Sequence, residues 1–417
     1  MIRATRTQWI KFAVVLALYL IFLVWLRSWL GLVVVPFIFD AYITKKIPWT
    51  WWRESKNRHV VTVMGWVDAI VFALVAVYFV NLYFFQNYVI PSSSLEKSLL
   101  TGDYLFVSKM SYGPRVPQTP LHMPLAQHTL PFFNCKSYLE HPQWDYKRVK
   151  GLGDVQLNDI VVFNFPAGDT VATGVPNDDI YRLSYGAGKE LAKPVDLASM
   201  TPEQQRVVYD YYYQLGREYL KENPQNFGEI ISRPVDRREN YVKRCVGLPG
   251  QTLEIKDRII YLDGKANKEP DNVQYRYLVK TKRPIPDDLA HELGISKEDM
   301  MMYYTDASVY NMPLTEKAKA GLLARKDIVV SIENTPADDA GGLYPLNMYK
   351  NWTTDNYGPV WIPKKGETVK LTIENLPVYE RPIHVYEGNE LAVKDGKIYI
   401  NGKETDVVYF QRWIITG

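Results

Sequence analysis

Apolar residues are concentrated in two segments within the first 90 positions of the chain. Residues 12–26 are uninterrupted apolar sequence, Arg27 breaks the run, and residues 29–39 resume it. A helix that crosses a bilayer needs about 20 apolar residues, so each half is short by itself. Residues 12–39 therefore form either one long tilted helix or a hairpin with Arg27 near its tip.

The second apolar segment, residues 66–85, is a cleaner candidate for a membrane span. It is interrupted only by Asp68 and Asn81. Aromatic residues, which favour the membrane–water interface, gather at its far end as Tyr83, Phe84, Phe85 and Tyr88. The pattern predicts a spanning helix that ends near residue 85.

Residues 40–65, between the two segments, are rich in positive charge and tryptophan: Lys45, Lys46, Arg53, Lys56 and Arg58, with Trp49, Trp51 and Trp52. The positive-inside rule places such a loop in the cytoplasm, and a basic loop that merely touches anionic lipid would lie on the same face. No small-x-small site closes the first apolar run, so it is not expected to be a cleavable signal peptide. Residues 1–88 are predicted to be a permanent membrane anchor, with everything after Tyr88 outside the cytoplasm.

Beyond the anchor, short apolar runs bounded by glycine, proline and aspartate predict β-strands. The runs are residues 104–107, 159–165, 241–246, 252–255, 258–262 and 369–373. Residues 256–265 resemble residues 394–403, which indicates two similar β-hairpins. Residues 89–417 are therefore predicted to form one mainly β extracytoplasmic domain.

Helices are expected inside two long inserts, at about 174–238 and 270–355. Thr201, Pro202 and Gln204 form the N-terminal signature of one helix: a capping threonine, a proline in the first turn and a glutamine three residues on. Two shorter helices are expected at 286–293 and 314–325. The fold class is thus N-terminal transmembrane helices plus a mainly β catalytic domain with helical inserts, which we expect to pack on the β core.

Composition narrows the classes of function. The chain has 417 residues and a formal charge of +3, and its mean hydropathy is −0.21. These values fit a mostly soluble protein with a few membrane segments, and they do not favour a nucleic-acid partner. The two cysteines, Cys135 and Cys245, exclude a disulfide scaffold, and we expect both to be unpaired. No Cys/His cluster has the spacing of metal ligands, so no metal is expected.

The candidate chemistry is a serine paired with a lysine. Residues 91–94 read Pro-Ser-Ser-Ser at the predicted exit from the membrane, and Lys243 lies in an apolar, strand-like run. No Ser-His-Asp motif or Gly-x-Ser-x-Gly elbow is present, but a lysine can serve as the base when burial lowers its pKa. Strand alternation would put Tyr241, Lys243 and Cys245 on one face. Taken singly, such serines are more often a linker and such a lysine is more often solvated.

The order of these segments resembles type I signal peptidase, the membrane-bound Ser/Lys endopeptidase of bacteria, and in particular its large-insert Bacteroidetes variants. The first family block, PSxSMxPTLxxGD, stands here as PSSSLEKSLLTGD at residues 91–103. The resemblance makes Ser94 the nucleophile and Lys243 the base, with the Ser92 side chain and the Ser94 N–H as the oxyanion hole. Leu95, Lys97 and Ser98 depart from the usual Met, Pro and Thr.

The resemblance also implies the substrate, the partners and the location. The substrates would be signal peptides of exported preproteins, bound as an extended strand near residues 88–91 and 240–242, without a cofactor. Besides these peptides, the lipid bilayer is the expected partner. The enzyme would lie in the bacterial inner membrane with its catalytic domain on the periplasmic side. The residues expected to contact substrate are Tyr88, Ile90, Pro91, Leu95, Leu99, Asn240, Tyr241 and Val242.

One family block, GDNRxxSxDSR, is not found in this sequence. In another reading frame, codons for residues 412–417 can encode a segment like the lead-in to that block, so we expect a frameshift just after Thr405 to have truncated the chain. The family activity is then expected to be weak or absent. A membrane-anchored peptide-binding homologue without turnover is the alternative function. A self-cleaving Ser/Lys repressor is a third candidate, and the membrane segments argue against it.

Three further residues or pairs have expected roles. Arg244 is expected to be structural and to pair with a carboxylate. Cys245 is expected to be a small buried hydrophobe rather than a reactive thiol. Phe132 and Phe133, with the region of Trp361, form either an apolar surface that rests on the membrane or ordinary core.

Overall fold

The computed structural model describes residues 4–130, 132–133, 135–168, 170–175, 178–301, 304–306, 308–337, 343–346 and 352–410. The chain divides into two compact units, each built from several segments. Unit 1 comprises Met1–Ile90, Gly102–Val155 and Pro234–Glu239, and unit 2 comprises Pro91–Thr101, Gln156–Arg233 and Asn240–Gly417. These units differ from the predicted division, which separates a membrane anchor from a catalytic domain after residue 88. That division stays a prediction.

The first apolar segment is a helical hairpin, which excludes the single tilted helix. Helix α1 (Arg6–Leu26) begins with a Thr5 capping box and ends at Arg27, whose φ of 50° is left-handed. The chain then turns back through a 3-10 turn (Leu30–Val34), α2 (Val35–Phe39) and a wider turn (Asp40–Thr44). The Tyr19 hydroxyl donates to the Gly31 carbonyl at 2.7 Å, and the Phe12 and Phe39 rings lie 5.4 Å apart.

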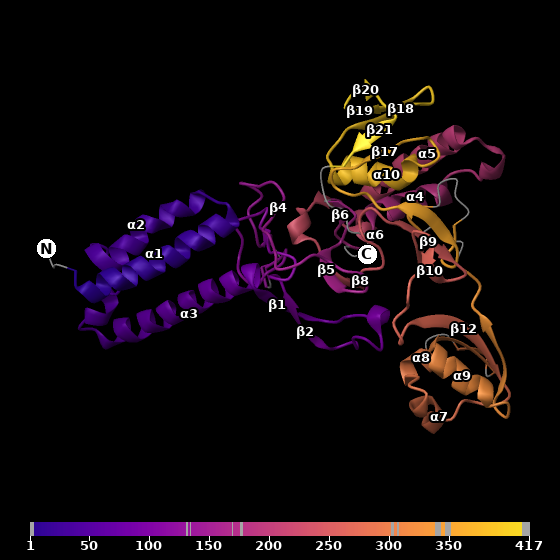
Figure 1. Cartoon of the computed structure of the whole chain (residues 1–417), viewed down its shortest axis with the longest axis horizontal. Helices are drawn as coiled ribbons and strands as arrows, with labels where there is room; N and C mark the ends of the chain where they lie inside the picture. Colours follow the sequence, from indigo (N-terminus) through magenta and orange to yellow (C-terminus); the bar gives the residue numbers. More distant parts are fainter. Residues whose placement is uncertain are drawn as a thin grey trace. The chain divides into compact units, whose positions relative to one another are not determined.

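Helix α3 (Arg58–Tyr83) contains residues 66–83 of the second predicted span and packs beside α1 (Figure 1). It begins eight residues earlier than predicted, inside the segment expected to be a loop, and ends two residues earlier because Phe85 begins a strand. The Phe22 ring of α1 lies 5.1 Å from Phe79 and 5.2 Å from Tyr83. Two helices in the described part of the chain, α1 and α3, are long and apolar enough to cross a membrane.

The rest of unit 1 gathers at the end of α3. Strand β1 (Phe85–Val89) pairs antiparallel with β2 (Tyr104–Ser108), and β3 (Arg115–Val116) pairs with β4 (Lys147–Arg148). The indole N–H of Trp25 donates to the Lys150 carbonyl at 3.1 Å, and the Lys147 ammonium donates to the Arg27 carbonyl at 2.7 Å. The tip of the α1–α2 hairpin and the chain that follows α3 are therefore at the same end of these helices.

Unit 2 consists mainly of small antiparallel sheets, as predicted. Its two-stranded sheets pair β5 (Ile160–Asn164) with β8 (Asn240–Arg244), β6 (Thr170–Ala172) with β7 (Ile230–Ser232), and β17 (Thr368–Lys370) with β21 (Val407–Tyr409). A four-stranded sheet has the order β11 (Lys265–Ala266), β10 (Ile259–Leu262), β9 (Thr252–Lys256), β16 (Tyr357–Trp361). A three-stranded sheet has the order β18 (Leu391–Lys394), β19 (Lys397–Ile400), β20 (Lys403–Glu404). The β9–β10 and β18–β19 hairpins contain the two similar segments, which confirms that prediction.

The first insert forms a helical hairpin of α4 (Ile180–Leu191) and α5 (Pro202–Glu222), followed by α6 (Pro224–Phe227). The predicted Thr201 capping box is present. Two ion pairs connect this hairpin to α10 (Leu376–Arg381). They join Arg206 to Glu380 at 2.7 Å and Arg381 to Asp179, the N-cap of α4, at 2.8 Å. A η7 turn (Pro382–Tyr386) follows α10.

The second insert buries a core of its own. Its sheet has the order β13 (Tyr304–Asp306), β14 (Val309–Thr315), β12 (Gln274–Thr281), β15 (Val329–Asn334). Three short helices lie between the strands of this sheet in the sequence: α7 (Asp287–Glu292), α8 (Lys297–Met301) and α9 (Glu316–Ala324). Its fully buried side chains include Val279, Met312, Leu322 and Ile328. Helix α9 begins later than predicted because Leu314 and Thr315 end β14, and Thr315 caps the helix.

Candidate active site

The serine segment is a tight turn within unit 2. Ser92 is extended, and Ser93–Leu95 form a 3-10 turn in which Ser94 is exposed. The Glu96 N–H donates to the Ser93 carbonyl, and the Leu99 N–H donates to the Leu95 carbonyl at 2.8 Å. These local bonds hold the Ser94 side chain at the surface of the turn.

Lys243 comes from β8, where it lies opposite Val161 of β5. Its Nζ is 2.7 Å from the Oγ of Ser94, and within the described residues this is its one hydrogen-bond partner. The side chain is partly withdrawn from water, and this desolvation lowers the pKa of Lys243 below that of an ordinary lysine. The arrangement has the elements of an activated nucleophile: a hydroxyl in contact with an amine that loses its proton more easily than usual.

Arg244, next to Lys243, connects the serine segment to the β5–β8 sheet. Its guanidinium donates to the Ser98 hydroxyl at 3.0 Å and to the Asn158 carbonyl at 2.9 Å. The prediction that Arg244 pairs with a carboxylate is therefore wrong within the described residues, where its guanidinium bonds a hydroxyl and a carbonyl instead. The contact holds the end of the serine turn on the strand that carries Lys243.

Lys97 explains one departure from the family pattern. Its φ is +68°, in the left-handed region, whereas proline is restricted to a φ near −65°. The family's proline is thus incompatible with the turn as this chain forms it. The side chain of Asn272, at the start of the second insert, donates to the Lys97 carbonyl at 3.3 Å.

The predicted substrate-contacting residues are distributed over both units. In unit 2, Pro91 and Asn240 are exposed, and Leu95, Leu99, Tyr241 and Val242 are half-buried. The Tyr241 ring stacks on Phe165 at 4.9 Å. Among the described strands β8 pairs only with β5, so its other edge carries no strand. The side chain of Ser92 is exposed, and its role in an oxyanion hole stays a prediction.

Tyr88 and Ile90 belong to unit 1. Tyr88 is half-buried in β1, and burial raises its pKa to about 12. Ile90 is only 3% exposed, and its backbone bonds with Gly102 and Asp103 close the turn that follows β1. That low exposure gives a substrate little access to the Ile90 side chain in this conformation.

The two cysteines are free. Cys135 is exposed, whereas Cys245 is buried and its pKa is raised by desolvation. Cys245 therefore lies in the apolar setting expected of a small hydrophobe. Within the described part of the chain, no group of three or more His, Cys, Asp or Glu residues could hold a metal ion.

Three residues around the serine turn make contacts that sequence reasoning did not predict: Ser98, Asn158 and Asn272. Asn158 offered a signal, since an asparagine directly before a predicted strand is typical of a turn, and here it adopts a φ of +68° that asparagine tolerates better than most residues. Ser98 and Asn272 offered none, because their partners are distant in sequence.

Comparison with known proteins identifies relatives of this chain. Residues 63–303, more than half of the chain, match the family model described as signal peptidase, peptidase S26. Signal peptidase I P of Bacillus subtilis subsp. natto is 20% identical over 279 residues, which cover 66% of this chain and 90% of that protein.

Two further relatives match over shorter regions. Signal peptidase I of Helicobacter pylori is 42% identical over 56 residues, 13% of this chain and 18% of the relative. Signal peptidase I of Rickettsia prowazekii is 24% identical over 165 residues, 36% of this chain and 56% of the relative. The matched region thus spans less than a fifth of the Helicobacter protein and little more than half of the Rickettsia protein. No solved structure shows a significant match. The match over more than half of its length shows that the chain belongs to the signal peptidase family, peptidase S26.

Proposed function

We propose that this protein is a membrane-bound serine endopeptidase that removes N-terminal signal peptides from exported preproteins. Ser94 is the nucleophile and Lys243 the general base. The observation that supports these roles is the 2.7 Å separation of the Ser94 hydroxyl and a lysine amine whose pKa is lowered, in a chain of the signal peptidase family.

The reaction is an acyl transfer in two steps. The neutral amine of Lys243 takes the proton of the Ser94 hydroxyl while Oγ attacks the scissile carbonyl. The peptide C–N bond breaks, the leaving amine takes that proton, and the signal peptide remains as an ester on Ser94. Lys243 then removes a proton from water, which attacks the ester and restores the serine. The Ser92 side chain and the Ser94 N–H would stabilise the oxyanion.

The substrate would be an extended segment with small residues at the first and third positions before the cut. It would add to the edge of β8 that no described strand occupies, next to Tyr241 and Val242. Pro91, Leu95 and Leu99 would contribute apolar contacts beside the nucleophile. Tyr88 and Ile90 stay candidates from unit 1.

The orientation that we propose follows from charge and from the hairpin. The basic residues between α2 and α3 would lie in the cytoplasm, and both α1 and α3 would end at the outer face of the inner membrane. The contacts of Trp25 and Lys147 support a common side for the hairpin tip and the chain after α3. The site would then lie on the periplasmic side.

A peptide-binding homologue without turnover is the second candidate. It is favoured by the single hydrogen bond that holds Lys243 within the described residues, since a general base works best when a second group aims it. The large-insert Bacteroidetes subtype is inferred from the two long inserts. The predicted frameshift after Thr405 concerns residues 406–417, of which residues 411–417 lie outside the described residues, and it is tested by the coding DNA.

The decisive experiment is cleavage of a preprotein by the detergent-solubilised full chain and three variants. We expect Ser94→Ala and Lys243→Ala to lower the rate by about 100-fold or more, the scale of a lost base or nucleophile. Ser93→Ala is the matched control, because it removes a neighbouring hydroxyl from the same turn and should cleave normally. Cleavage that survives Lys243→Ala would reject the Ser/Lys mechanism. Binding of the preprotein without cleavage by the parent would favour the second candidate.

A further inference from the structure

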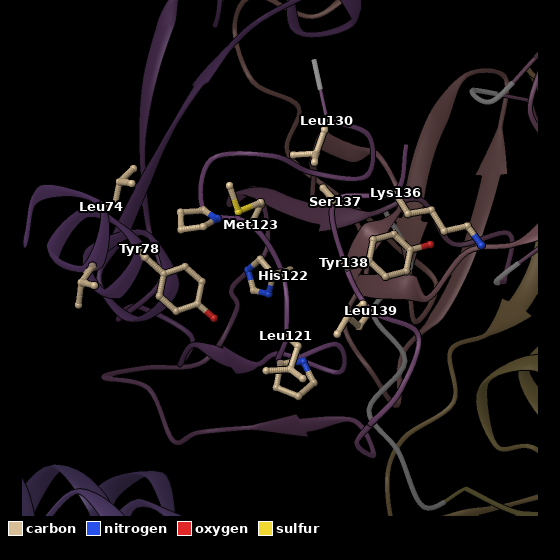
Figure 2. A pocket seen from close by; sticks show the side chains of 13 residues that line it. Leu74, Tyr78, Leu121, His122, Met123, Leu130, Lys136, Ser137, Tyr138 and Leu139 are labelled. Atoms are coloured by element: carbon tan, nitrogen blue, oxygen red, sulfur yellow. The ribbon is translucent and has the colours of Figure 1, made fainter. Parts of the chain in front are cut away.

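An open pocket of about 510 Å³ lies in unit 1, between α3 and a loop whose described residues are 120–130, 132–133 and 135–139. One wall is made by Leu74, Val75 and Tyr78 of α3, and the loop supplies Leu121, Met123 and Leu139 among others (Figure 2). We call this pocket the α3 groove. Its volume is within the range of roughly 300–1,000 Å³ typical of ligand pockets.

The loop wall of the α3 groove is held in a fixed shape. The Met123 N–H donates to the Ser137 carbonyl at 2.7 Å, and the Leu139 N–H donates to the Leu121 carbonyl at 2.9 Å. At the base of the loop, the buried carboxylate of Asp236 accepts from the Thr119 N–H at 3.1 Å. These bonds make the groove a built feature of unit 1.

Three of the polar side chains that line the groove, His122, Ser137 and Lys136, have partners inside the protein. The Nδ1 of His122 bonds the Thr119 carbonyl at 2.9 Å, and the Ser137 hydroxyl donates to the Ala126 carbonyl at 3.4 Å. The Lys136 ammonium is paired with Glu140 at the rim. A polar ligand would therefore find few unsatisfied partners, whereas the aliphatic side chains provide contact for an apolar one.

The position of the groove along α3 indicates what that occupant is. Tyr83, at the end of α3, is the first of the aromatic residues expected at the membrane–water interface, which we call the aromatic belt. Tyr78 and Leu74 precede Tyr83 by five and nine residues. At 1.5 Å per residue these positions lie about 7–14 Å below the belt, within the outer half of a hydrocarbon core about 30 Å thick. At that depth the surrounding medium is lipid acyl chain.

We propose that the α3 groove binds one acyl chain of an outer-leaflet phospholipid. The proposal rests on the membrane anchoring and orientation proposed above. It is supported by apolar side chains that the loop exposes next to the groove: Leu125 is 72% exposed, Phe132 100% and Phe133 79%. Exposed apolar side chains of this kind are unfavourable in water but stable in the outer leaflet, so we place them in the lipid from which the groove would take its acyl chain.

The test uses the full chain in phosphatidylcholine vesicles that contain a phosphatidylcholine with a diazirine on one acyl chain. After irradiation, labelled peptides are mapped by mass spectrometry. We expect Met123 and Tyr138 in the groove to be labelled together with Phe72, an exposed residue of α3 that reports contact with bulk lipid. Replacing Leu121 and Leu139 by serine should lower groove labelling about tenfold and leave Phe72 labelling unchanged. Leu152→Ser is the control, since it removes an exposed leucine of unit 1 that lies outside both the groove lining and its loop.

Leu139→Trp should fill the groove without making it polar. Loss of groove labelling in this variant as well would show that the acyl chain needs the space of the groove, and that misfolding of the serine variant is not the cause. Labelling of Phe72 without labelling of the groove would overturn the acyl-chain proposal and leave the membrane anchor intact. Absence of labelling at Phe72 and in the groove would reject the proposed membrane anchoring. Groove labelling by a preprotein with a photoactivatable residue in its apolar segment, with none from the lipid, would instead assign the groove to the signal peptide. Preprotein cleavage is measured in parallel, so failure of the peptidase proposal is seen separately.

Discussion

At the residue scale, the site depends on the protonation of Lys243 and on the geometry of the serine turn. Desolvation lowers the pKa of Lys243 because burial penalises the charged ammonium. Only the neutral amine can accept the Ser94 proton. The lowered pKa thus connects partial burial of one side chain to the proposed reaction.

The pH dependence of cleavage follows from this protonation. We expect the single-turnover rate to rise with pH as Lys243 loses its proton, with a midpoint below the value of about 10.4 of an ordinary lysine. Lys243→Arg is the control and should stay inactive at every pH, because arginine remains protonated. A rate that falls with pH over this range would contradict a lysine base.

Lys97 tests whether the left-handed backbone of the serine turn matters. Lys97→Gly should retain cleavage and relieve strain of about 1 kcal/mol, because glycine adopts a φ of +68° without a steric penalty. Lys97→Pro should abolish cleavage, because proline cannot adopt that angle and would displace Ser94. Preprotein cleavage and thermal unfolding measure the two effects. Full activity of Lys97→Pro would show that the turn can form differently.

At the scale of elements, the α4–α5 hairpin is held by close helix packing as well as by its ion pairs to α10. A Cβ at Gly188 of α4 would lie 1.7 Å from the Tyr212 carbonyl oxygen, and one at Gly216 of α5 would lie 1.7 Å from the Ser184 carbonyl oxygen. The two helices thus approach closely enough that only glycine fits at these positions. The capping signature at Thr201 identified α5 in the sequence but gave no reason to select these two glycines.

The glycines of α4 provide a matched pair of variants. Gly188→Ala should destabilise the protein by about 2–3 kcal/mol, because the methyl group forces the helices apart. Gly186→Ala has no atom within 4 Å of the new Cβ and should stabilise by up to about 1 kcal/mol through helix propensity. Thermal unfolding of the two variants should therefore shift in opposite directions. Equal shifts would show that the helices do not pack as closely as described.

At the scale of the whole molecule, the proposed function requires a defined membrane orientation. The serine segment would have to lie on the side where exported proteins emerge. The hairpin of α1 and α2 and the helix α3 together predict a cytoplasmic N-terminus, a cytoplasmic loop between α2 and α3, and an external remainder.

Cysteine labelling in intact cells tests this orientation. In a variant without Cys135 and Cys245, a membrane-impermeant maleimide added outside should label Leu152→Cys and not Lys56→Cys. Both original residues are exposed, so access to each depends on the side of the membrane. Labelling of Lys56→Cys in unbroken cells would reverse the orientation, and lysed cells provide the control in which both react.

The sequence predicted best those features that depend on neighbouring residues. Apolar length predicted α1 and α3, the Thr201 signature predicted the start of α5, and short apolar runs bounded by turn residues predicted the β-rich unit 2. These features are local, because capping and side-chain periodicity act over a few residues. The candidate pair, Ser94 and Lys243, was selected by resemblance to a family.

Tertiary structure decided which residues far apart in the sequence come into contact. Ser94 and Lys243 are 149 positions apart, and only the pairing of β8 with β5 and the docking of the serine turn bring them together. The hairpin at Arg27, the partners of Arg244 and the α3 groove were likewise open or unseen in the sequence. Each depends on which surfaces pack across long separations, a sum of many weak contacts that local pattern does not encode. The sequence alone thus determined the elements and their chemistry, and the folded chain decided which of those chemical groups meet.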